Sequence, residues 1–67
     1  MTHEWYAAVG GLGLQIAEPP AEDVFAGIIR TKSKNRYEIE RWDGATDVRA
    51  SLAAAQSRLL DMVGATR

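Results

Sequence analysis

The amino-acid sequence predicts an α+β fold: a small antiparallel sheet with one C-terminal amphipathic helix packed on one face, in the order β-β-β-β-α. Three observations predict it. Apolar residues recur with a helical period in the last quarter of the chain. Two β-favouring segments flank a polar stretch in the middle, and two short apolar runs flank a glycine pair near the N-terminus. A chain of 67 residues has room for one domain, residues 1–67.

The N-terminal third predicts a β-hairpin. Residues 4–9 and 12–17 are apolar runs, and Gly10-Gly11 separates them. Because glycine tolerates positive φ, we expect these two glycines to form the tight turn. A pair of prolines follows and ends the second strand, since proline cannot donate a hydrogen bond to a sheet.

The segment from residue 20 to 30 is ambiguous, because its apolar residues fit both a strand and the spacing of a helix. Gly27 weakens a helix, and the adjacent Ile28 and Ile29 favour a strand. We therefore expect a strand over residues 24–31. A helix here would contradict the four-stranded sheet.

The next segment, residues 36–42, alternates polar and apolar side chains and ends at an Asp-Gly pair, a strong turn signal. We expect it to form a hairpin with the preceding strand through a loop of residues 33–35. That loop length sets Ile29 opposite Ile39 and keeps one face apolar. It also requires a left-handed residue, and asparagine at position 35 accepts that conformation more readily than most residues.

The C-terminal segment predicts an amphipathic helix from Leu52 onward. Ser51 can cap its first turn, and Gly64 can take the left-handed conformation that ends its last turn. Arg58 is expected on the exposed side, together with Ser57 and Asp61. The apolar stripe expected to face the sheet consists of Leu52, Ala55, Leu59, Met62 and Val63.

Composition excludes several classes of site and predicts that a partner, or a second copy of the chain, adds stability. The chain has no cysteine and one histidine, so it lacks disulfides, thiolate metal sites and nitrogen-rich metal sites, and we expect no cofactor. A domain of this size buries only about 60 % of the surface of its unfolded chain. Its core is therefore thin, and a partner or a homodimer is an expected source of stability.

Charge and hydropathy argue against a membrane protein. The net charge is −1, which produces no general attraction to nucleic acid or to acidic lipid. The longest uncharged run covers residues 5–17, too short to span a bilayer. The N-terminus lacks the basic start of a signal peptide. Together with the absence of cysteine, these features predict a cytoplasmic protein.

The candidate binding residues lie in and after the central hairpin. Four cations stand at every second position from residue 30 to 36, with no acid among them, and an extended strand places them on one face. This row suits a protein or phosphate partner; alternatively, it is a solvated hairpin tip that resists edge pairing. Acids of the following strand can neutralise half of it. The candidates are Arg30, Lys32, Lys34, Arg36, Glu38, Glu40 and Trp42.

Trp42 has two interpretations. Its position in the alternation is opposite to that of Tyr37 and Ile39, so a regular strand points it away from the helix. An exposed tryptophan beside charges is typical of a binding anchor. Alternatively, a bulge near the Asp-Gly turn returns it to the core. Trp5, by contrast, is expected in the core.

These features predict a binding protein and no enzyme. No nucleophile has a candidate base nearby, since the one histidine is His3, close to the terminus. In its small size and its lack of a catalytic site, the chain is similar to accessory proteins of phages and other mobile elements, although no motif links it to them. These include anti-CRISPR inhibitors, which cover a surface of a larger complex. We expect a protein-binding module, and the alternatives are a nucleic-acid-binding protein using the basic hairpin 30–36 and a self-assembling structural subunit.

Overall fold

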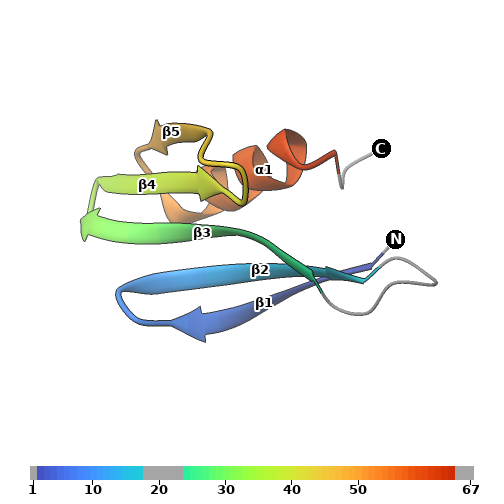
Figure 1. Ribbon diagram of the computed structural model, residues 1–67. Coiled ribbons are helices and arrows are strands. Elements are labelled where there is room, and N and C mark those ends of the chain that lie inside the picture. The colour runs from blue at the N-terminus through green and yellow to red at the C-terminus, as the bar shows by residue number, and fades with distance from the viewer. Residues whose placement is uncertain (1, 18–23, 65–67) are drawn as a thin grey trace.

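The computed structural model describes residues 2–17 and 24–64, which form a five-stranded antiparallel sheet followed by one helix (Figure 1). Each strand pairs with the next one in sequence, and α1 packs on one face, mainly against β3, β4 and β5. The α+β class is therefore confirmed. The predicted break at Pro19-Pro20 lies outside the described residues. The elements are β1 (Thr2–Ala8), β2 (Gly11–Ala17), β3 (Val24–Ser33), β4 (Arg36–Arg41), β5 (Thr46–Arg49) and α1 (Leu52–Met62).

The sheet has one strand more than predicted. The ambiguous segment is the strand β3, as expected, but β5 was missed. With four residues, two of them charged, β5 is too short to show a clear alternation of polar and apolar side chains. Its pairing with β4 holds it in the sheet, for example Ile39 opposite Asp47.

The first hairpin turns one residue earlier than predicted. Ala8 pairs with Gly11, so Val9 and Gly10 form the turn, and Gly10 alone has positive φ, at 79°. Gly11 is instead the first residue of β2. A Cβ at Gly11 would collide with the carbonyl oxygen of Ile29 on β3. The second glycine therefore permits a close approach of two strands.

The central hairpin has the predicted register and a different loop. Ile29 lies opposite Ile39, as expected. The loop is a two-residue turn, and the register shifts between Thr31 and Ser33, so that Lys32 is an extra residue in β3. The extra residue in β3 compensates for the shorter loop, so the predicted register is kept. The prediction that Asn35 is left-handed is wrong, because no described non-glycine residue has positive φ.

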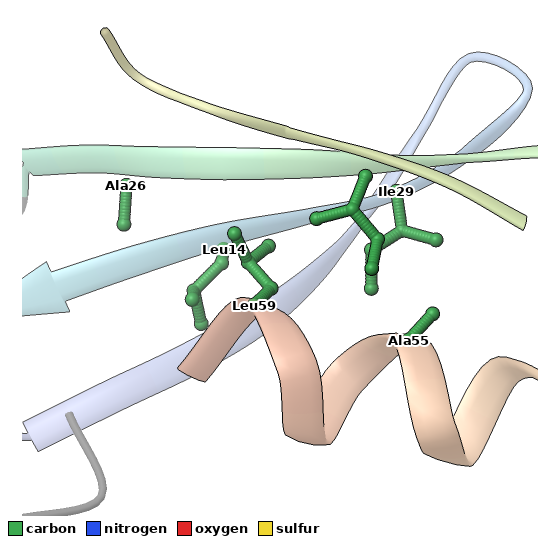
Figure 2. Packing of buried hydrophobic residues seen from close by; sticks show 6 residues of the cluster. Leu14, Ala26, Ile29, Ala55 and Leu59 are labelled. Atoms are coloured by element: carbon green, nitrogen blue, oxygen red, sulfur yellow. The ribbon is translucent and has the colours of Figure 1, made fainter. Parts of the chain in front are cut away.

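The core lies between α1 and the central strands (Figure 2). Leu59 fits over Gly27, where an added Cβ would stand 2.7 Å from its Cδ1 atom. Trp5, expected in the core, is only half-buried and packs against the buried cluster from outside. The six buried residues are Leu14, Ala26, Ile29, Ile39, Ala55 and Leu59.

Both predicted ends of α1 are confirmed. The Ser51 hydroxyl accepts a hydrogen bond from the Ala54 amide at 3.2 Å, and Gly64 follows the helix with φ of 76°. One further contact was not predicted: Arg41 Nη1 donates to the carbonyl oxygen of Met62 at 2.7 Å. A cation at a helix C-terminus also interacts favourably with the helix dipole. This contact ties the end of β4 to the end of α1.

Candidate protein-binding surface

One face of the sheet is covered by α1 and the other is open. Ile29 and Ile39 are fully buried in the core beneath α1, so their chain neighbours point to the opposite side. The registers align these neighbours in rows across the sheet. We call this side the open face. Its side chains include Tyr6, Gln15, Phe25, Ile28, Arg30, Glu38, Glu40, Thr46 and Val48.

Ion pairs connect the basic row to the acids of β4. Arg30 Nη1 lies 2.7 Å from Glu40 Oε1, a diagonal contact rather than the directly opposite one with Glu38. Glu38 instead forms ion pairs with two other cations of the row. Its Oε1 lies 3.9 Å from Lys32 Nζ, and its Oε2 lies 3.4 Å from Arg36 Nη2. Five of the seven candidate residues are therefore brought together on the open face.

The two carboxylates cancel half of the positive charge of the row, as the sequence suggested. Lys34 stands in the turn, exposed, at the tip of the hairpin. All these pairs are substantially solvated, so each contributes little to stability. Their effect is to present alternating charges of both signs, which suits a protein partner of mixed charge better than a polyanion.

Trp42 lies at the other end of β4 and is 65 % exposed. It is the first residue of a three-residue turn in which the Gly44 amide donates to the Arg41 carbonyl at 2.9 Å. Gly44 has φ of 94°, as in a turn that ends in a glycine bulge. The alternative interpretation, in which a bulge near this turn returns Trp42 to the core, is wrong, because the indole lies in solvent. The interpretation of Trp42 as an exposed side chain is correct.

An ion pair holds the turn that carries Trp42. Arg41 Nε and Nη2 donate to the two carboxylate oxygens of Asp43 at 2.8 and 2.6 Å. Asp43 also accepts from the Ala45 amide at 3.2 Å. Chiefly through the hydrogen bond from Arg41, the pKa of Asp43 falls to about 2. Since Arg41 also binds the carbonyl oxygen of Met62, the turn that carries the indole is tied to the end of α1 as well as to Asp43.

Sequence reasoning missed two exposed apolar residues on the open face. Phe25 on β3 is 47 % exposed and Val48 on β5 is 40 % exposed. Val48 escaped notice because β5 was not predicted. Beside it lies an open depression of about 520 Å³. The open-face residues that line it are Arg30, Glu38, Glu40, Thr46 and Val48.

On the opposite face, Asp47 joins β5 to α1. Arg58 Nε donates to Asp47 Oδ2 at 2.7 Å, and Arg49 Nη1 donates to Oδ1 at 2.9 Å. Arg58 also reaches Asp61, three residues along the helix, at 3.1 Å. The prediction that Arg58 belongs to a purely exposed side is therefore wrong. The missing signal was again β5, which supplies its partner.

This network predicts a loss of stability in acid. The pKa of Asp47 is lowered from 3.8 to about 2, chiefly by the hydrogen bond from Arg58. A lowered pKa in the folded state stabilises the protein above the unfolded pKa, and this contribution is lost as pH falls from about 4 to about 2. Asp47→Asn should be less stable than the native chain at neutral pH and should lose less across this range. Urea unfolding at several pH values measures both, and parallel curves would contradict the assignment.

The described residues contain neither a cluster of metal-ligating side chains nor a helix long enough to cross a membrane. Within residues 2–17 and 24–64, no group of three or more metal-ligating side chains is gathered. The 11-residue α1, the helix of these ranges, is too short to cross a bilayer.

No family model, curated protein or solved structure matches this chain.

Proposed function

We propose that this chain is a non-enzymatic protein-binding module whose contact surface is the open face of the sheet with Trp42. The observation that carries the proposal is the exposure of Phe25, Trp42 and Val48 around a ladder of paired charges. Interfaces typically combine buried aromatic anchors with a polar rim. Trp42 is the proposed anchor, and the ion-paired hairpin supplies the rim.

The chemistry of the surface favours a protein over a nucleic acid. Glu38 and Glu40 stand among the cations, and both would repel phosphates. A larger bacterial complex, covered by this module as an inhibitor covers its target, is the proposed class of partner. The proposal places the module in the cytoplasm, because a chain without cysteine suits a reducing compartment.

Trp42→Ala is expected to weaken partner binding at least tenfold, since anchor residues contribute about 2 kcal/mol or more to an interface. The fold should survive, because the side chain is 65 % exposed and its loss should change stability by no more than about 0.5 kcal/mol. Affinity capture from the source cells, with native and Trp42→Ala chains as baits, measures the effect. A protein captured by the native chain should be recovered in much smaller amount with the Trp42→Ala chain, and equal recovery by the two baits would contradict the role of Trp42.

A matched control uses Val9, a fully exposed apolar residue on the turn between β1 and β2. Val9→Ala removes exposed apolar surface outside the proposed interface and should leave capture unchanged. Equal loss from the two variants would contradict the role of Trp42. Retarded duplex DNA that is released when Lys32 and Lys34 are replaced by glutamate would instead favour the nucleic-acid alternative.

A further inference from the structure

The two edges of the sheet differ in how well they are protected against pairing. β5 is an edge of four residues, and Asp47 and Arg49 carry charges on it. β1 is the other edge, with seven residues, a single acid in Glu4, and neither lysine nor proline (Figure 1). Proteins normally protect edges with short strands, lysine, proline or bulges. Among the described residues, nothing of this kind protects β1.

The helix also leaves this side of the sheet uncovered. α1 packs mainly on β3, β4 and β5, so the hairpin of β1 and β2 extends beyond it (Figure 1). Trp5 and Leu12 face the same side as α1, because they lie in register with buried core residues, and both are only half-buried. An apolar strip therefore runs along the inner side of the open edge.

The backbone orientation of β1 follows from its turn. Ala8 and Gly11 close a two-residue turn and form a hydrogen-bonded pair, and pairs of this kind recur at every second residue. Tyr6 is thus bonded to β2. Trp5 and Ala7 turn their N–H and C=O groups outward, where a further strand can bind them.

We propose that the protein forms a two-fold symmetric dimer by antiparallel pairing of β1 with β1 of a second copy, centred on Trp5. The symmetry axis then passes through the middle of the strand, and all seven residues pair. Trp5 faces Trp5 of the second copy, a favourable cross-strand aromatic pair. Glu4 faces Tyr6 of the second copy, so the two Glu4 carboxylates do not lie opposite each other. Moving the centre to Glu4 would place two carboxylates opposite each other and leave residues unpaired.

The geometry fixes the shape of this dimer. An antiparallel pair related by a two-fold axis keeps equivalent side chains on one face, so both helices lie on the same side of a continuous ten-stranded sheet. The strip formed by Trp5 and Leu12 meets the same strip of the second copy in the space between the two helices. This burial supplies the apolar contact that the thin core of one chain lacks. The dimer leaves Trp42 and the ion-paired hairpin exposed, so it stands apart from the proposed function.

Ala7→Pro tests the pairing in the full chain. Ala7 is exposed, and proline at this edge position removes an outward N–H without removing a bond to β2. The native chain should sediment with about twice its 7.3 kDa mass, and the variant should raise the dissociation constant of the dimer at least about tenfold. Val9→Pro is the control, because a turn position accepts proline, and it should leave the dimer intact. Circular dichroism checks that both variants fold.

The register has its own test, because the chain contains no cysteine. His3→Cys with Ala7→Cys places the new thiols on residues that lie opposite each other in the dimer, with Cα atoms about 5.5 Å apart, within disulfide range. Mild oxidation should cross-link the double variant and spare both single variants. A native chain that sediments as a monomer would overturn the proposal. So would a dimer that the cysteine pair fails to cross-link.

Discussion

Leu59→Ala is expected to lower the free energy of unfolding by about 2–5 kcal/mol. The Leu59 side chain is completely buried at the centre of the contact between α1 and the sheet. Gly27 lies directly beneath it and has no side chain that could fill the space left by the substitution. The cavity would therefore persist and add its cost to the lost burial. Urea unfolding followed by circular dichroism measures the change.

The control for this prediction is Ser57→Ala. Ser57 lies in the same helix, two residues away, and its side chain is exposed. Its replacement should change stability by no more than about 0.5 kcal/mol. Arg58 would be a poor control, because it binds Asp47 of β5. Similar losses from Leu59→Ala and Ser57→Ala would show that α1 presents a different face to the sheet.

Gly11→Ala is the second large effect expected, with a loss of about 3 kcal/mol or failure to form the native sheet. An added Cβ would overlap the carbonyl oxygen of Ile29. Because that oxygen belongs to the backbone of β3, relief requires β2 and β3 to move apart. Such a movement disturbs the register at the centre of the core. The measurement is the same urea unfolding experiment.

Gly13→Ala separates this effect from a general preference for glycine in β2. A Cβ at Gly13 would meet the ring of Tyr6, a side chain that can rotate aside. The reduced entropy of the unfolded chain offsets part of the cost, so we expect a change within about 1 kcal/mol. A loss at Gly11 as small as the loss at Gly13 would mean that the approach of β2 to β3 is looser than the structure shows.

The sequence predicted well the features that are encoded by local periodicity. The stripe of α1 and its caps at Ser51 and Gly64 were predictable, because each depends on residues close in the chain. The pairing of Ile29 with Ile39 followed from keeping one face apolar. The same reasoning placed Arg30 and Glu40 on one face, where they form an ion pair.

Features that depend on contacts between strands were not predictable. The turn of the first hairpin lies one residue earlier than predicted, and Gly11 stands where β3 leaves no room for a side chain. The bulge at Lys32 makes the loop one residue shorter than predicted but keeps Ile29 opposite Ile39. Because the register is unchanged, the alternation of polar and apolar residues does not distinguish the two arrangements. β5 is stabilised by β4 and by Arg58 rather than by its own sequence. Its omission concealed the exposure of Val48 on the candidate surface.

Site-specific photocross-linking tests the proposed interface most directly. A photoreactive phenylalanine derivative, which keeps an aromatic side chain at the anchor position, replaces Trp42 or Val48 on the proposed surface, or Ala54 on the exposed side of α1, and the chains are expressed in the source cells. We predict that the first two positions cross-link to the same protein partner and that Ala54 does not. Cross-links from Ala54 to that partner, with none from Trp42 or Val48, would contradict binding through the open face.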